Sequence, residues 1–357
     1  MVNWFMKLTG FEEKANAGQK LRSLLRNGTK LVLPDGRSYE CGRLEVPTLT
    51  SLRDRCTFDL GTNTCAPHSL RVREVIGDVA QLHVKHPNAV FQVASQFNLL
   101  EMISPTVTPE EGVTRYMLDG TQGPACSIAV GAATIYRNYL APMAEYPTTS
   151  PPTDGQLGQT ETCQIDCLAD LGTELSRGCT RTHQETSERL WNMQNGYALC
   201  TTEGLKSISS YLETLSDDEY DQLAGHLRIG VQSNAQVTAS STVNHTVTQV
   251  FCSALPVAYT TVPRKLWESF AFLILMGTYE ATMYAALENY AATGNAKVFL
   301  TYVGGGVFGN AGSWIADAIL QSLNKFAHTP LQVELISYGE PNPIARSVIR
   351  RFAGKKR

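Results

Sequence analysis

Short apolar runs alternate with stretches of helical periodicity along most of the chain. Four runs rich in Val, Ile, Leu and Phe predict buried strands, at residues 89–95, 247–259, 297–303 and 331–337. Alternating residues predict a half-exposed strand at 227–238, and a further strand is expected at 196–201. Apolar residues at helical spacing predict helices at residues 126–139, 205–223, 263–292 and 313–326. Strands that alternate with helices from residue 89 onward indicate an α/β domain with a largely buried sheet.

The first 85 residues predict a lead-in to this domain. Helical spacing covers 11–25 and 69–83, and a short strand between them turns at Asp35-Gly36. His83 and His86 flank the end of the second helix, where we expect them at the surface rather than on a metal. We therefore predict a lead-in at 1–85 packed on the main domain, the main domain at 86–345, and a basic tail at 346–357.

A glycine loop follows the strand at 297–303. Residues 304–310 read GGGVFGN, and the missing Cβ atoms let backbone N–H groups approach a bound anion such as a phosphate. The helix that starts near Gly312 would add its N-terminus to such a site. The alternative is a glycine-rich turn that only lets the helix pack on the sheet.

Two further segments carry polar groups where strands end or helices begin. Gln96, Phe97 and Asn98 follow the strand at 89–95, and ligands of α/β sheets bind at the carboxyl ends of strands. A second glycine bend, residues 119–125 (DGTQGPA), leads into a helix of small residues.

Asp166 and Asp170 lie one turn apart in an amphipathic segment, where they act together or are simply solvated. Glu280, in the middle of the long helix, is either a surface charge or a buried partner.

Composition narrows the class of protein. A net charge of −3 over 357 residues gives no reason to expect nucleic-acid binding, and we interpret the basic C-terminal segment as solvated. The longest apolar run, 270–276, is too short to span a bilayer, so we expect no membrane association.

The nine cysteines bear on the compartment and on metals. They are odd in number and follow an N-terminus without a secretory pattern, which predicts reduced thiols and a cytoplasmic protein. Cys163 and Cys167 lack a second Cys or His pair nearby, so we expect no metal.

Taken together, the strand end at 96–98, the bend at 119–125 and the loop at 304–310 resemble the ligand-binding elements of macrodomains, which bind ADP-ribose. The segments FQVASQFNLLE (91–101) and LDGTQGPAC (118–126) are most similar in sequence to the divergent macrodomains that remove ADP-ribose from arginine. The resemblance implies a three-layer α/β/α sandwich with a mixed central sheet and an N-terminal extension. It implies a cleft for ADP-ribose, with Phe308 against the distal ribose and no other cofactor. The ligand-binding residues implied are Ser95, Gln96, Phe97, Asn98, Thr121, Gln122, Gly123, Pro124, Ala125, Gly304, Gly305, Gly306, Val307, Phe308, Gly309 and Asn310.

The chain also departs from this family. The common Asn-x-x-Gly-Gly-Gly signature is absent, because Leu99, Leu100 and Glu101 follow Asn98. No Gln-Glu-Glu follows the glycine loop, so the catalytic arrangement of poly(ADP-ribose) glycohydrolases does not carry over. This departure weakens cleavage of poly(ADP-ribose) chains as the reaction.

Hydrolysis of a glycosidic bond to arginine requires a carboxylate that activates water or protonates the leaving group. The candidates are Asp119, Glu101, Asp166 and Asp170, which would also attract a cationic substrate. We therefore predict a hydrolase that releases mono-ADP-ribose from protein side chains, with an ADP-ribosylated protein as partner. A reader module that binds ADP-ribose without chemistry is the alternative, and a regulatory module for another nucleotide is a third.

Overall fold

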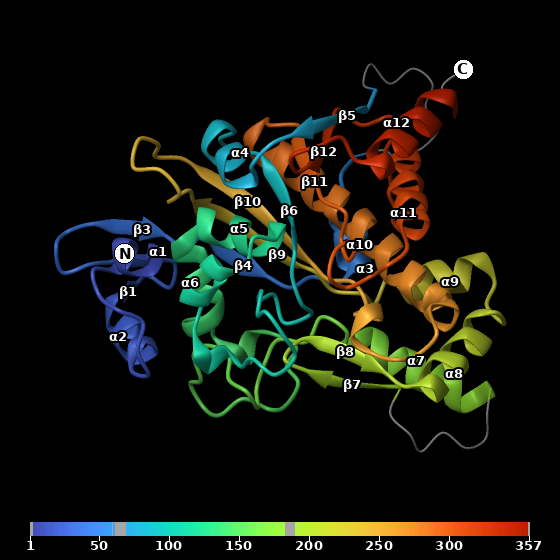
Figure 1. The fold of residues 1–357 in the computed structure, drawn as a ribbon, viewed down its shortest axis with the longest axis horizontal. Coiled ribbons are helices and arrows are strands. Elements are labelled where there is room, and N and C mark those ends of the chain that lie inside the picture. Colours follow the sequence, from blue (N-terminus) through green and yellow to red (C-terminus); the bar gives the residue numbers. More distant parts are fainter. Residues whose placement is uncertain (1–2, 59, 61–68, 183–189, 356–357) are drawn as a thin grey trace.

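A seven-stranded mixed sheet forms the centre of the computed structural model, which describes residues 3–58, 60, 69–182 and 190–355 (Figure 1). Five strands run parallel, and β9 lies antiparallel to both β10 and β4 at one side. The strands in spatial order are β4 (Arg43–Glu45), β9 (Gly230–Gln236), β10 (Thr246–Cys252), β6 (Val90–Ala94), β11 (Lys297–Leu300), β12 (Gln332–Ser337) and β5 (Arg71–Ile76).

Helices cover both faces of this sheet. Successive side chains of β6 point to opposite faces. Phe91 stacks on His83 of α4 with ring centroids 3.7 Å apart, whereas the amide of Gln92 donates to Thr282 of α10 at 2.8 Å. The first face carries α4 (Val79–Lys85), α5 (Gln122–Ala129) and α6 (Gly131–Tyr139), and the second α10 (Arg264–Thr293), α11 (Gly312–Lys325) and α3 (Leu49–Arg55). The predicted three-layer α/β/α sandwich is confirmed.

The long helix α10 runs through the core. By length and composition alone it would cross a membrane, but 94% of its most apolar window is buried inside the protein, as in a core helix. Its charged residue Glu280 is buried and accepts from Arg53 at 2.7 Å and from Lys325 at 2.6 Å. Of the two alternatives for Glu280, the buried partner is therefore the one observed.

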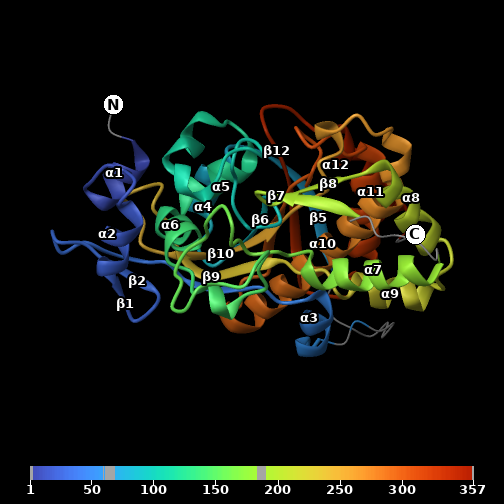
Figure 2. The same ribbon diagram turned by 90° about the horizontal axis from the view of Figure 1, so that it is seen from below.

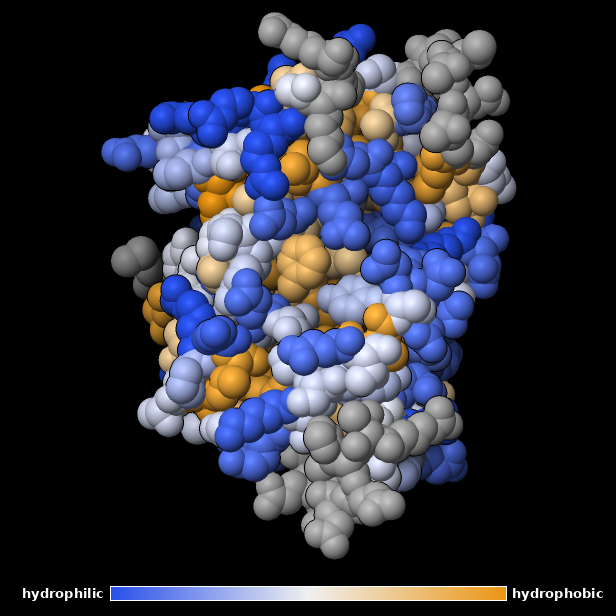
Figure 3. Space-filling model, turned by 90° about the vertical axis from the view of Figure 1, so that its right-hand side faces the viewer, coloured by the Kyte–Doolittle hydropathy of each residue, from blue (hydrophilic) through white to orange (hydrophobic). Residues whose placement is uncertain are grey.

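Smaller elements flank the sandwich at its two ends (Figure 2). One end holds α1 (Trp4–Thr9), α2 (Ala17–Leu24) and a sheet of β1 (Leu25–Arg26), β2 (Lys30–Val32) and β3 (Ser38–Glu40). The other holds the hairpin β7 (Trp191–Gln194) and β8 (Tyr197–Cys200) with α7 (Ala169–Thr182), α8 (Thr202–Leu212) and α9 (Asp217–Ala224). Within the described residues, four 3₁₀ turns, η1 to η4, cover Pro109–Glu111, Thr114–Leu118, Met143–Glu145 and Val257–Tyr259. Figure 3 shows the side of the molecule with α8, α9 and α11, which is mostly hydrophilic around small apolar areas.

The N-terminal segment differs from its prediction in two respects. Residues 71–76 form β5 rather than part of a helix, because they pair in parallel with β12, and only 79–85 are helical. His83 is fully buried rather than at the surface, because its ring stacks on Phe91. Strands β4 and β5 are also the two edge strands of the central sheet, so a division at residue 85 cuts across that sheet.

Three later segments also differ from prediction. The predicted helix at 205–223 is two helices, because Ser216 forms a capping box with Glu219 and starts a new one. The segment 163–175 becomes helical only at Ala169. The basic tail is not a solvated segment: α12 (Pro343–Lys355) packs on α11 and β5 and buries Val348 and Phe352. Lys356, Arg357 and Cys65 lie outside the described residues.

Close packing of α5 on β6 yields a test of the fold. A Cβ on Gly123 would lie 2.0 Å from the carbonyl oxygen of Ala94, whereas a Cβ on Gly120 would meet nothing within 4 Å. We expect Gly123→Ala to lower the free energy of unfolding by at least about 2 kcal/mol, because backbone must move to admit the methyl group. Gly120→Ala is the matched control and should stay within about 0.5 kcal/mol of the wild type. Urea unfolding measures both, and equal stability of the two variants would contradict this packing.

Candidate functional site

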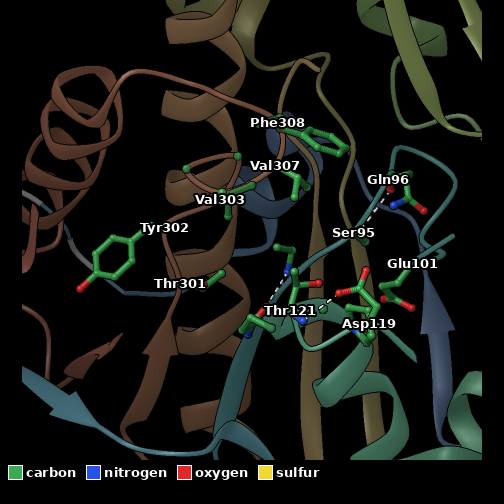
Figure 4. A pocket seen from close by; sticks show the side chains of 18 of the residues that line it. Ser95, Gln96, Glu101, Asp119, Thr121, Thr301, Tyr302, Val303, Val307 and Phe308 are labelled. Carbon is green, nitrogen blue, oxygen red and sulfur yellow. Dashed lines mark hydrogen bonds between the residues drawn. The ribbon is translucent and has the colours of Figure 1, made fainter. Parts of the chain in front are cut away.

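A cavity of about 410 Å³ opens at the carboxyl ends of β6, β10 and β11 (Figure 4). Residues that follow each of these strands reach it, which is where ligands of parallel sheets bind. The first turn of α5 and the glycine loop form two of its walls. The lining residues are Ala94, Ser95, Gln96, Glu101, Met102, Ile103, Asp119, Thr121, Gln122, Gly123, Pro124, Tyr197, Ala254, Tyr259, Thr301, Tyr302, Val303, Gly304, Gly305, Gly306, Val307, Phe308, Asn342 and Ile344.

The cavity exists because β6 and β11 separate near their ends. Their pairing stops at Phe91 and Phe299. Beyond that point the side chain of Gln122 bonds the backbone of β6, accepting from the N–H of Ala94 at 3.0 Å and donating to the carbonyl of Gln92 at 2.8 Å. A side-chain amide therefore replaces a neighbouring strand and satisfies polar groups that the opening would leave unpaired.

The loop between β6 and the cavity carries an unusual backbone conformation. Leu99, which is buried, has a φ of 65°, in the left-handed region that non-glycine residues seldom adopt. Arg137 donates to the carbonyl of Leu99 at 3.1 Å, and Asn98 accepts from the N–H of Leu100 at 3.0 Å. These bonds fix the direction in which the next residue, Glu101, leaves the loop.

Glu101 is the most perturbed acid of the cavity. Its side chain is 2% exposed, and its Oε2 accepts from the hydroxyl of Ser127 at 2.7 Å and lies 3.9 Å from Nη2 of Arg137. Within the described residues, its Oε1 has no hydrogen-bond partner. Burial raises the pKa of Glu101 to about 7, although Arg137 and Ser127 oppose the rise. With this pKa, both the protonated and the ionised form of the carboxyl group are populated at neutral pH.

Asp119 lies beside Glu101 in a different environment. It is half-buried, and its Oδ1 accepts from the N–H of Thr121 at 2.8 Å (Figure 4). Its negative charge is one of the causes that raise the pKa of Glu101. When two neighbouring carboxyl groups lie in unlike surroundings, one can serve as a general acid and the other as a general base.

The glycine loop presents backbone donors to the cavity. Gly304 and Gly309 have φ values of 74° and 73°, which require glycine, and Asn310 closes the loop by donating its N–H to the carbonyl of Gly304 at 2.9 Å. Within the described part of the chain, the N–H groups of Gly306, Val307 and Phe308 donate to no protein acceptor. Consecutive unpaired N–H groups in a turn of this kind suit the binding of an anion, and we refer to these three as the anion nest.

An aromatic wall lies next to these donors. The ring of Phe308 lies 5.3 Å from that of Tyr197 and 5.5 Å from that of Tyr259, between centroids. Tyr197 is fixed by donating its hydroxyl to the carbonyl of Met102 at 2.8 Å. The wall therefore spans the glycine loop and the loop that carries Glu101.

Most of the predicted ligand-binding residues meet in this cavity, and some do not. Phe97, Asn98, Ala125, Gly309 and Asn310 do not line it. Asn98 and Asn310 are buried: Asn98 accepts from Leu100 N–H in its own loop, and the side chain of Asn310 donates to Leu255 O in the segment after β10. The first residues of α11 are also outside its lining, so the glycine loop and not this helix N-terminus provides the donors.

Two of the four predicted acids lie elsewhere. Asp170 forms an ion pair with Arg228 at 2.7 Å, and Asp166 accepts from the N–H of Leu168 at 2.9 Å just before α7 begins. Neither lines the cavity. Because Asp166 precedes the helix, the two acids do not lie on one helix face, the arrangement in which they would act together.

Sequence reasoning missed residues that the fold brings to the cavity. Arg137 of α6 and Ser127 of α5 lie behind the cavity lining and support Glu101. The sequence predicted these two helices as one, at 126–139, and recognised it only for its small residues, although a lone arginine amid them was a usable signal. Tyr302 follows β11 as Ser95 follows β6, so the rule applied to one strand end would have found the other. Tyr197 and Tyr259 carry no comparable local signal. Among the described residues, no group of three His, Cys, Asp or Glu side chains is placed to hold a metal ion.

Comparison with known proteins gave matches among solved structures only. No protein-family model matches the chain, and no curated protein matches it. Poly(ADP-ribose) glycohydrolase from Thermomonospora curvata matches over 95% of this chain and 97% of its own, at 13% identity and a TM-score of 0.39. Poly(ADP-ribose) glycohydrolase from Deinococcus radiodurans in complex with ADP-ribose matches over 87% of this chain and 94% of its own, at 10% identity and a TM-score of 0.40. Similarity at this level carries no weight for function, which depends here on the residues of the cavity.

The raised pKa of Glu101 predicts a dependence of stability on pH. Its ordinary pKa of 4.5 becomes about 7 in the fold, so the folded state favours the protonated form. The stability contributed by this proton is fully present below pH 4.5 and is lost as the pH rises through 7. Glu101→Gln mimics the protonated group, so its stability relative to the wild type should increase by up to roughly 3 kcal/mol between pH 4.5 and 8.

Urea unfolding of both proteins across this range measures the difference. Asp170→Asn, at an acid outside the cavity, is the control and should show no comparable change relative to the wild type. A constant difference between Glu101→Gln and the wild type would show that Glu101 is ionised in the fold at pH 5.

Proposed function

We propose that the protein binds ADP-ribose in this cavity and hydrolyses the bond between ADP-ribose and a modified protein side chain, arginine in particular. The observation that carries the proposal is the pair of carboxyl groups at one end of the cavity, one buried with a pKa of about 7 and one half-buried. An anion nest and an aromatic wall complete the same cavity.

The binding part of the proposal follows from the glycine loop. The unpaired N–H groups of Gly306, Val307 and Phe308 suit the oxygens of a diphosphate. The ring of Phe308 then lies beside the sugar that follows the diphosphate, in the direction of Glu101 and Asp119. Figure 4 shows Tyr302 on the opposite side of the pocket from these two acids, and the proposal places the rest of the nucleotide between them.

The chemical part assigns one role to each acid. Water attacks C1 of the distal ribose and gives a proton to Asp119, while the bond from C1 to the arginine nitrogen breaks. The nitrogen keeps the electron pair, leaves as a neutral guanidine and takes the proton of Glu101. Solvent then carries the proton from Asp119 to Glu101. Water and the modified arginine become ADP-ribose and arginine, with no proton unaccounted for.

A module that binds ADP-ribose without chemistry is the second candidate. The observation in its favour is that Glu101 accepts from Ser127 and lies 3.9 Å from Arg137, contacts that also serve a purely structural role. Activity measurements on single-residue variants separate the two candidates.

Turnover should depend on both acids. We expect Glu101→Gln and Asp119→Asn each to lower kcat on an arginine-ADP-ribosylated peptide by at least about 100-fold, because each removes a proton transfer. Asp170→Asn, at an acid outside the cavity, should stay within about 2-fold. In the wild type kcat/KM should fall as the pH rises through 7, where Glu101 loses its proton. Released ADP-ribose is the readout; full activity of both cavity variants would contradict the roles given to the two acids, and no release by the wild type would leave only the binding function.

Ligand preference tests the binding part separately. Because the nest has three donors in a row, we expect ADP-ribose and ADP to raise the melting temperature more than AMP at equal concentration. ADP-ribose should exceed ADP, since only it places a sugar against Phe308. A thermal shift as large for adenosine as for ADP-ribose would show that the diphosphate does not contribute to binding.

A further inference from the structure

Exposed apolar side chains gather at the acid end of the cavity. Within the described residues, six large hydrophobic side chains are exposed: Ile76, Ile103, Met117, Leu118, Val307 and Tyr338. Ile103 and Val307 line the cavity, and Leu118 directly precedes Asp119, which lines it too. Leu118 is 74% exposed and Met117 50%. Apolar groups gathered beside a polar site in this way mark a contact surface for another molecule.

Three of them, Ile103, Met117 and Leu118, belong to two segments that are tied together beside Glu101. The hydroxyl of Tyr116 accepts from the N–H of Glu101 at 3.0 Å, which joins the turn carrying Met117 and Leu118 to the loop carrying Ile103. The backbone of this turn is held in addition by Glu13, which accepts from the N–H groups of Val113 and Thr114. The two segments that carry these three exposed side chains are therefore held together next to Glu101, and we call Ile103, Met117 and Leu118 the apolar rim.

We propose that the apolar rim binds the polypeptide that carries the modified arginine, next to the bond that is cut. This inference rests on the proposed function. The acids Glu101 and Asp119 lie where the arginine nitrogen departs, so whatever is attached to the arginine must continue outward past this end of the cavity. ADP-ribose itself lies on the other side of the acids and cannot cover the rim.

Charge around the rim favours the same occupant. Glu110 and Glu111 are exposed on the turn that precedes it, and Glu110 accepts from the N–H of Glu161, which is also exposed. Arg115 is paired with Glu111, so the acids outnumber the bases here. A polypeptide with a leucine-like residue beside the modified arginine, and with basic rather than acidic neighbours, fits this surface. A free ADP-ribosylated small molecule would gain nothing from it.

The test compares three substrates: ADP-ribosylarginine alone, and two ADP-ribosylated peptides that differ in a leucine or a serine next to the modified arginine. For the wild type we expect kcat/KM about 10-fold higher for the leucine peptide than for the serine peptide, because part of a leucine side chain is buried. The double variant Met117→Ser with Leu118→Ser should lose this preference and turn over ADP-ribosylarginine within 2-fold of the wild type. Ile76→Ser, on the edge strand β5, is the matched control and should keep the preference.

Two results would overturn the proposal. One is a preference for leucine that survives in the double variant. The other is an equal loss of turnover on all three substrates, which would mean that the rim acts through Asp119 alone. If the wild type releases no ADP-ribose from any substrate, the hydrolase proposal fails by itself. Calorimetry of the two peptides on the wild type and the double variant still decides the docking proposal, by the presence or absence of the same 10-fold preference in Kd.

Discussion

The site depends on one buried cation. Arg137 is fully buried and donates to Leu99 O, Gln232 Oε1 and the hydroxyls of Ser127 and Thr134, while its guanidinium lies 3.8 Å from the ring centroid of Phe251. It thereby joins the strained loop after β6, the helix α5 and the strand β9. Burial lowers the pKa of Arg137, yet an arginine keeps its charge at any physiological pH. The fold therefore keeps a permanent positive charge under Glu101, which limits how far burial raises the pKa of that acid.

This arrangement explains why the two carboxyl groups of the cavity differ. Glu101 is removed from water but retains one hydroxyl donor and a cation at 3.9 Å, so neither protonation state is strongly excluded near neutral pH. Asp119 is bound to a backbone N–H at the start of α5 and keeps contact with solvent. The glycine loop carries no acid, so the proposal gives it a role in binding and not in catalysis. It thus assigns binding and chemistry to opposite walls of the cavity, which opens where β6 and β11 separate beyond Phe91.

Much of the layered fold was predictable from local periodicity, because buried strands and the long helix α10 carry continuous apolar patterns. The edge strand β5 was not, since its mixed pattern at 71–76 fits a helix as well and only pairing with β12 decides it. The cavity was partly predictable from strand ends and glycines, which gave Ser95, Gln96, Asp119 and the loop at 304–308. The sequence named Asp166 and Asp170 as candidate acids although neither lines the cavity. Spacing also gave no means of seeing that Arg137 supports Glu101 across 36 positions, since that contact forms only when α6 packs beneath the loop.

The protonation of Glu101 is the central claim, and it can be observed directly. Carboxyl-carbon NMR of protein labelled at glutamate, with Glu101→Gln used to assign the resonance, follows this group through a pH titration. We predict that Glu101 titrates near pH 7, well above the ordinary glutamate value of 4.5. A midpoint near 4.5 would contradict it, because Glu101 would then be ionised at neutral pH and would hold no proton to give to a leaving group.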